Sequence, residues 1–294
     1  MQPYLLRTFL ERGNGLHFAS PPPADITDRR YLQSHDLDEV LACVLANLQK
    51  GRFDLANVPM RLVQLREVPG LWVACAALLG FSAPMRALRS FVDEFGGRLT
   101  GASRFYVCDA AMSSGAFWAV ETILAAYPDM VAADFRRFLG HGLSWLLEQE
   151  PGPAWDGPDL VEVPGDPLPP GEQPETRLNL DAYMAMVREQ ARALRRAEAL
   201  RDESVVAEGR VLVIKDVAQR LLDRLRRGER GDRIEKGRML LEATTGLNCG
   251  AFFNKDYMLQ PLAAAAIVEE FLDSGEAEKY EAGVRYFFGH RIPD

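Results

Sequence analysis

Hydrophobic positions recur at helical spacing along most of the chain, and the densest pattern covers residues 69–97. Trp72, Cys75 and Leu79 fall one helical step apart, and almost every position around them is apolar, which predicts a helix buried on all sides. Gly80 is expected to end this helix and Pro84 to begin a second one. The second helix would bury one stripe, made of Met85, Leu88, Phe91, Val92 and Phe95.

A firm helix start precedes this pair, at Asp36. Asp36 and Glu39 have the spacing of a capping box, in which the first side chain caps the helix and the second reaches back to its amide. Further helical patterns cover 105–127, 135–147, 179–194, 217–225, 256–272 and 274–283, and the first is interrupted at residues 113–115. Residues 211–214 could form a strand, but the pattern that continues from them favours a helix. No stretch alternates with the period of a strand, so the predicted fold class is all-α.

Composition changes abruptly at residues 148–175. This stretch holds eight acidic side chains, no Lys or Arg, and eight of the 18 prolines, so it can neither propagate a helix nor bury much surface. The predicted organisation is an N-terminal arm (1–35), a helical lobe (36–150), an acidic Pro-rich linker or loop (151–178) and a second helical lobe (179–294).

Charge and composition exclude several functional classes. The net charge of −8 argues against a nucleic-acid-binding protein, which needs a basic surface. No apolar run approaches the length that spans a bilayer, and the N-terminus lacks the pattern of a signal peptide, so we expect a cytoplasmic protein without a membrane partner. The four cysteines and four histidines show no metal-ligand spacing, and neither a metal nor a cofactor is expected.

The helical pair at 70–95 resembles one unit of a HEAT-type repeat, an apolar helix joined by a tight Gly/Pro turn to a second helix. The resemblance covers about residues 36–150 and implies an α-solenoid of antiparallel helix pairs. Because no sequence repeats at a fixed period, an irregular helical bundle remains the alternative.

Two further segments, residues 285–290 and 244–250, resemble motif-bearing pieces of the immunity proteins of bacterial polymorphic toxin systems. Several of those families are acidic, all-helical and without catalytic motifs, so the resemblance implies a non-enzymatic protein that binds and occludes a toxin. The residues expected to contact such a partner are Asn248, Asn254, Lys255, Asp256, Arg285, Tyr286 and His290.

An enzyme is the first alternative, a hydrolase or transferase with Cys249 as nucleophile. Its thiolate would be favoured by a following helix N-terminus, with His290 or His141 as the base. The same polar run also fits a plain turn, with Gly246 ending one helix and Asn254 capping the next.

Two arginine stripes provide the second alternative. Arg188, Arg192, Arg195 and Arg196 recur at helical spacing, as do Arg220, Arg224 and Arg227. Either stripe could bind an anion or RNA, or receive the acidic 148–175 segment within the chain or across a homodimer. Since acids are interleaved and few aromatic residues accompany the arginines, we favour a solvated face with pairs such as Glu189–Arg192 and Asp216–Arg220.

Overall fold

The computed structural model of the chain describes residues 23–65, 69–96, 98–99, 101–129, 133–148, 160–161, 177–178, 180–256 and 258–294. Its α-helices are α2 (Leu37–Leu48), α3 (Asn57–Leu65), α4 (Pro69–Ser82), α5 (Met85–Phe95), α6 (Gly101–Ser113), α7 (Ala119–Ala126), α8 (Ala133–Leu147), α9 (Leu180–Ala197), α10 (Ile214–Arg226), α11 (Asp232–Thr245) and α12 (Pro261–Asp273). The strands, all in two-residue antiparallel pairs, are β1 (Leu160–Val161) with β2 (Arg177–Leu178), β3 (Val206–Ala207) with β4 (Arg210–Val211), and β5 (Tyr286–Phe287) with β6 (His290–Arg291).

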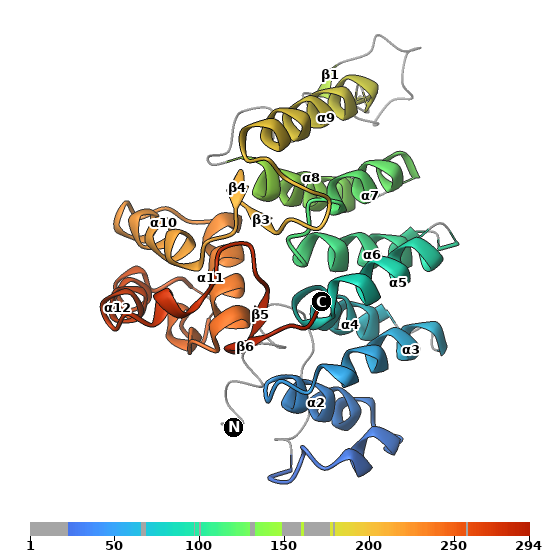
Figure 1. Cartoon of the computed structure of the whole chain (residues 1–294), viewed down its shortest axis with the longest axis vertical. Helices are drawn as coiled ribbons and strands as arrows, with labels where there is room; N and C mark the ends of the chain where they lie inside the picture. Colours follow the sequence, from blue (N-terminus) through green and yellow to red (C-terminus); the bar gives the residue numbers. More distant parts are fainter. Residues whose placement is uncertain are drawn as a thin grey trace, which may run out of the picture.

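The all-α prediction is confirmed. Helices α2 to α9 lie one after another in a layered array, here called the stack, while α10 to α12 lie together against one side of it (Figure 1). Helix α11 and the strands β3 and β5 run along the boundary between the two groups. Among the described residues, no helix is long and apolar enough to cross a membrane.

Helix α4 is the buried centre of the stack, as its uniform apolarity predicts. Ala74, Cys75 and Leu78 are completely inaccessible to solvent. The prediction that Gly80 ends this helix is wrong, because the helix continues to Ser82. A Cβ atom on Gly80 would lie 2.5 Å from the Ser113 Cβ, so this glycine instead allows α4 and α6 to pack closely.

The start of α2 is also partly corrected. Asp36 is the N-cap, but its side chain accepts a hydrogen bond from the Asp38 amide at 2.9 Å. The Glu39 carboxylate does not reach back to the cap and accepts the Ser34 hydroxyl at 2.6 Å, while Ser34 Oγ accepts the Asp36 amide at 3.1 Å. A serine outside the helix thus takes the place that a capping box gives to the glutamate.

Two helix–helix–hairpin arrangements occur after residue 132, α8 and α9 with the β3–β4 hairpin, and α11 and α12 with the β5–β6 hairpin. In one, the β3–β4 turn donates its Glu208 and Gly209 amides to the Trp145 and Leu146 carbonyls at the end of α8. In the other, the β5–β6 turn donates its Phe288 and Gly289 amides to the Ala243 and Thr244 carbonyls at the end of α11. Both turns have two consecutive positive φ angles, 52° and 67° in the first and 47° and 79° in the second. Each hairpin therefore supplies partners for carbonyls that a helix end leaves unsatisfied.

These hairpins are the main departure from the predicted elements. Residues 210–211 form a strand before α10 begins at Ile214, and the tail at 286–291 is a hairpin. The helix predicted from 256 begins only at Pro261, and the one predicted over 274–283 is a 3-10 turn at Glu276–Lys279. The interruption at 113–115 is a true break, where α6 ends and Gly115 has a φ of 68°.

The division into two lobes at residues 151–178 stays a prediction. Apart from 160–161 and 177–178, that segment lies outside the described residues, as do most of the N-terminal arm and the Asn179 cap. Among the described helices, α9 follows the segment in sequence and lies at the end of the stack beside α8 (Figure 1).

Candidate functional site

The described residues 253–256 and 258–260, here called the loop, come directly before α12 in the connection that leads from α11, and they are held by several hydrogen bonds. The Asn254 side chain accepts hydrogen bonds from the amides of Asp256 and Met258, both at 2.9 Å. The Asn254 amide donates to the Met258 carbonyl at 3.0 Å, and the Gln260 amide donates to the Phe252 carbonyl at 2.7 Å. Asn254, predicted as a possible helix cap, therefore organises the loop through its own turn.

A buried ion pair supports this loop from inside. Arg238 and Glu242, one turn apart on α11, are both within 1% of complete burial and are hydrogen bonded at 2.5 Å. The Arg238 guanidinium also lies 6.0 Å from the centre of the Phe253 ring, at the start of the loop. The first residue of the loop therefore packs on a buried ion pair of α11.

Hydrophobic side chains are exposed in this loop and at the start of α12. Among the described residues, the large hydrophobic side chains that are exposed are Phe138, Met258 and Leu262, and Leu262 is 89% exposed. Leu262 follows Pro261, which begins α12, and Ala263 and Ala266 continue the exposed apolar face along that helix. We call Met258, Leu262, Ala263 and Ala266 the α12 surface. Exposed apolar side chains that follow one another along a loop and the start of a helix make this segment a candidate interaction site.

Three of the predicted partner-contact residues border or approach the α12 surface. Lys255 and Asp256 are exposed on the same loop, and Asn254 is half-buried beneath them. Asn248 is exposed as well, but its side chain accepts the Gly250 amide at 3.0 Å and so closes a turn. The sequence indicated this region through its polar residues and missed Met258 and Leu262, whose signal is an apolar pair beside a helix-starting proline.

The other predicted contact residues lie on the C-terminal hairpin, away from that loop. The Arg285 guanidinium donates to the carbonyls of Ala83, at 2.6 Å, and Gly80, at the end of α4, and burial lowers its pKa to about 10. Tyr286 stacks edge-on against Tyr280, with ring centres 5.1 Å apart. His290 is exposed, and its ring lies against Gly51. Arg285 thus holds the hairpin to the stack, a structural role that the sequence did not indicate.

Cys249 has the surroundings of an inert thiol. It is completely buried, and burial together with the nearby Glu242 carboxylate raises its pKa well above the ordinary value. An activated nucleophile needs the opposite, a thiolate stabilised in a partly exposed, electropositive site. His290, one of the two histidines proposed as its base, lies against Gly51, whereas Cys249 lies beside the Arg238–Glu242 pair. The two side chains therefore have different neighbours.

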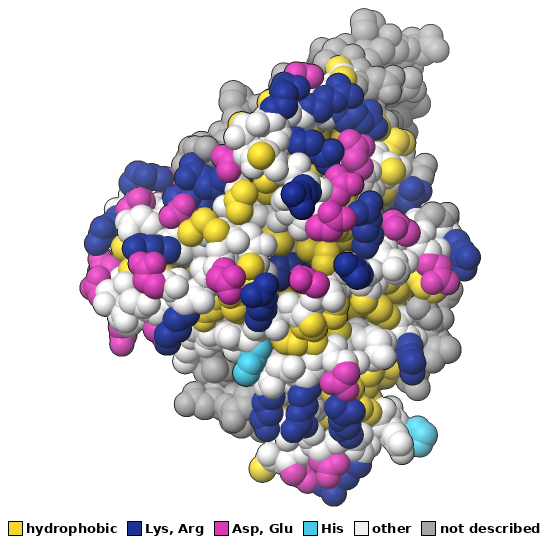
Figure 2. Space-filling view, in the orientation of Figure 1, with side chains coloured by type: hydrophobic (Ala, Val, Ile, Leu, Met, Phe, Trp, Pro, Cys, Tyr) yellow, Lys and Arg dark blue, Asp and Glu magenta, His cyan; other side chains and the backbone are white. Residues whose placement is uncertain are grey.

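The arginines of α9 are exposed, or half-buried in the case of Arg188, and each lies near an acid. Arg188 lies 3.8 Å from Glu121, and Arg192 and Arg196 each lie 3.9 Å from Glu189. Arg195 binds Asp202 at 2.5 Å and lies over the Phe117 ring. Figure 2 shows acidic and basic side chains interleaved over the visible face of the molecule. These contacts agree with a solvated, paired face, and anion binding there stays a prediction.

The second arginine stripe is divided: Arg227 is exposed and lies 2.6 Å from Glu229, as in a solvated face, whereas Arg220 and Arg224 are directed inward. Arg220 and Arg224 both donate to Glu208, a completely buried carboxylate on the β3–β4 turn, and Arg233 lies 3.7 Å from it. Arg233 also donates to the Glu148 carbonyl at 3.1 Å. The network therefore joins α10 and α11 to the end of α8, and Arg220 is directed there rather than toward Asp216.

Within the described part of the chain, no group of three or more His, Cys, Asp or Glu side chains could hold a metal ion. Comparison with protein families, with curated proteins and with solved structures finds no match for this chain.

Proposed function

We propose that this chain is a non-enzymatic protein-binding scaffold, a bacterial immunity protein that neutralises a cognate toxin by covering it, and that the α12 surface is its contact site. The observation that carries the proposal is the exposure of Met258 and Leu262, the first of them in a loop whose backbone is hydrogen bonded to Asn254. A partner that covers these two side chains would restore the favourable burial that their exposure gives up.

The composition of the surface fits a protein partner. Apolar side chains form its centre, and Lys255, Asp256 and Glu270 lie exposed around it. Interfaces between proteins share this arrangement, an apolar centre within a polar rim. The net charge of −8 would speed encounter with a basic toxin without adding much to the final affinity.

The ordered loop also favours binding energetically. Its Asn254 hydrogen bonds fix the backbone before any partner arrives, so little conformational entropy is lost on association. A contact made through preformed elements needs no catalytic group, and the buried Cys249 supplies none.

The test is co-expression of the full chain with a toxin encoded beside its gene. We expect the two proteins to co-purify and the chain to restore growth of the toxin-producing cells. Leu262→Asp should weaken the complex by at least about 30-fold, the loss expected for an anchor residue at the centre of an interface.

The matched control is Ala185→Asp, which adds the same charge at an exposed position on α9. It should leave binding unchanged. A chain that neither binds nor protects against the neighbouring toxin would refute the function. A complex that tolerates both Leu262→Asp and Met258→Asp would refute the assigned surface while keeping the function.

A further inference from the structure

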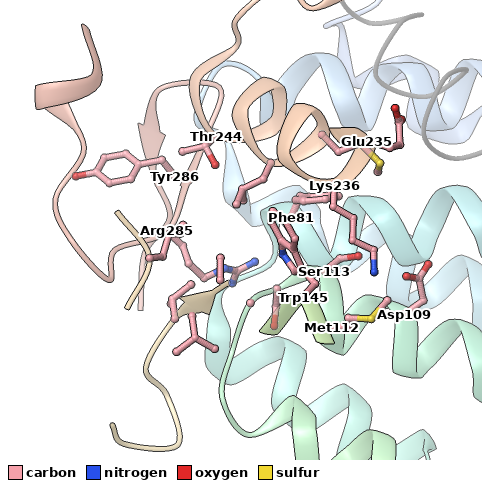
Figure 3. A pocket seen from close by; sticks show the side chains of 18 of the residues that line it. Phe81, Asp109, Met112, Ser113, Trp145, Glu235, Lys236, Thr244, Arg285 and Tyr286 are labelled. Carbon is pink, nitrogen blue, oxygen red and sulfur yellow. The ribbon is translucent and has the colours of Figure 1, made fainter. Parts of the chain in front are cut away.

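A cavity of about 320 Å³ lies at the boundary between the stack and α11. Helices α4, α6 and α8 form one side, α11 forms another, and the two hairpins close the third (Figure 3). An apolar cavity of about 150 Å³ in another protein is large enough to bind benzene. The cavity at α11 has roughly twice that volume, so it has room for a bicyclic ring.

Aromatic rings and methionine side chains line the cavity from several helices. Phe81 on α4 and both Phe138 and Trp145 on α8 contribute rings. Met112 on α6 and Met239 on α11 contribute thioether groups. Rings pack well edge-on against a further ring, and a methionine sulfur makes favourable contacts with ring edges. This wall therefore favours an aromatic ligand over an aliphatic one.

Phe138 lies where the cavity meets solvent. Of the exposed large hydrophobic side chains named above, it is the one outside the α12 surface, and it is 42% exposed while also lining the cavity. Phe81 and Met239, which line the same cavity, are half-buried. A ligand can therefore enter beside Phe138, and it would cover apolar surface that the folded chain leaves accessible.

The charged side chains among the described lining residues balance one another, since two are acidic and two are basic. Arg285 donates to the Gly80 and Ala83 carbonyls, and Glu235 accepts two hydrogen bonds from Arg238, one of them at 3.1 Å. These two lining residues are therefore already engaged by the protein itself.

The other two charged lining residues, Asp109 on α6 and Lys236 on α11, are engaged as well. Burial raises the pKa of Asp109 to about 6, although the Lys236 charge and a hydrogen bond from the Ser113 hydroxyl both act to lower it. The Lys236 ammonium nitrogen lies 5.7 Å from the centre of the Phe138 ring, within the range of a cation–π contact. An ionic ligand would have to displace such contacts and would meet no net charge in return, whereas a neutral ligand leaves them in place.

We propose that this cavity binds a neutral bicyclic aromatic molecule. Its ring would lie among Phe81, Met112 and Trp145, with Phe138 at the mouth. The inference does not depend on the proposed toxin-binding function, because the α12 surface contributes no residue to the cavity wall.

The experiment is isothermal titration of the full chain with indole. Tryptamine and indole-3-acetate, which carry the same ring with a cationic or an anionic group, are the matched analogues. We expect indole to bind with a Kd below about 1 mM and each analogue to bind at least about 10-fold more weakly, the loss expected when a charged group is buried without a partner of its own. This comparison uses the unaltered protein, so it does not depend on the folding of a variant.

Two variants test the location of the site. Met239→Trp should abolish indole binding, because the larger side chain fills part of the cavity. Phe138→Ala, which removes an already exposed side chain, should weaken indole binding by about 2- to 10-fold, the contribution of one aromatic pair. Leu262→Ala, which removes an exposed side chain outside the cavity wall, should leave the affinity for indole unchanged.

Absence of indole binding up to about 1 mM would overturn the proposal. Binding of either charged analogue as tight as that of indole would overturn it too, because the cavity would then not select a neutral ligand. An affinity for indole unchanged in both Met239→Trp and Phe138→Ala would show that indole binds elsewhere, and would overturn the assigned site.

Discussion

Replacement of Glu208 tests the buried network that joins the two parts of the molecule. The carboxylate is completely buried and receives Arg220 and Arg224, and Arg224 is only 2% exposed. Glu208→Ala would remove the buried counter-charge of both guanidinium groups, and Arg224 would keep only the more distant, partly exposed Glu229 carboxylate, 3.8 Å away, as an acidic partner among those described. Breaking a buried pair from one side costs about 3–5 kcal/mol, and we expect the upper part of that range because Arg233 also lies 3.7 Å from the lost carboxylate.

The position of Glu208 in a turn provides a matched control. Its φ of 52° is unfavourable for any side chain but free for glycine. Glu208→Gly removes the same carboxylate and relieves about 1 kcal/mol of backbone strain, so it should be more stable than Glu208→Ala by that amount. The difference in unfolding free energy between the two variants measures the backbone strain in the turn, and the loss that they share measures the contribution of the ion network.

Urea unfolding followed by circular dichroism measures both effects. A loss of this size is a large share of the about 5–15 kcal/mol that stabilises a typical protein, and it should lower the urea midpoint by more than about 1 M. Adding Arg224→Met to Glu208→Ala should cost less than the sum of the single changes, because one uncompensated charge is then removed. A loss below about 1 kcal/mol for Glu208→Ala would refute the reasoning.

Three other predictions follow from single side chains. Gly80→Ala should cost about 1–3 kcal/mol of unfolding free energy, because its Cβ would lie 2.5 Å from that of Ser113. The control Gly237→Ala meets only ordinary contacts at 3.4 Å or more and should be neutral or stabilising. Equal changes of the two variants in urea unfolding would contradict this prediction. Burial raises the pKa of Asp109 from 3.8 to about 6, so the folded state holds the proton more strongly and stability falls as pH rises between those values. Asp109→Asn should therefore raise the unfolding free energy by up to about 3 kcal/mol at pH 7 and by almost nothing at pH 3.5, and a gain independent of pH would contradict the assignment. Cys249 should react with iodoacetamide only after unfolding, which mass spectrometry of the labelled peptide can show, and rapid labelling of the native chain would contradict its burial.

Periodicity predicted the fold class and the burial of α4, since both follow from local sequence. It could not predict why Gly80 is a glycine, because the atoms that require it belong to Ser113 and Ala110 on another helix. Gly80 therefore resembles a helix stop in the sequence and is a packing contact in the structure.

The sequence pattern likewise could not predict which partners the charged residues have. Arg220 and Arg224 have the spacing of a solvated stripe, yet their partner, Glu208, comes from a hairpin that has only two residues in each strand. Strands this short leave no alternating pattern to detect. Residues 254–256 stay a predicted contact site, and the exposure of Met258 and Leu262 beside them follows from the tertiary structure and not from any local pattern.

The contact assigned to the α12 surface can be measured most directly by amide hydrogen exchange of the chain, alone and in complex with the toxin encoded beside its gene. The account predicts slower exchange in the complex at residues 254–266, with no change over α9. Slower exchange confined to α9, or to the β5–β6 hairpin with the 254–266 segment unchanged, would contradict it.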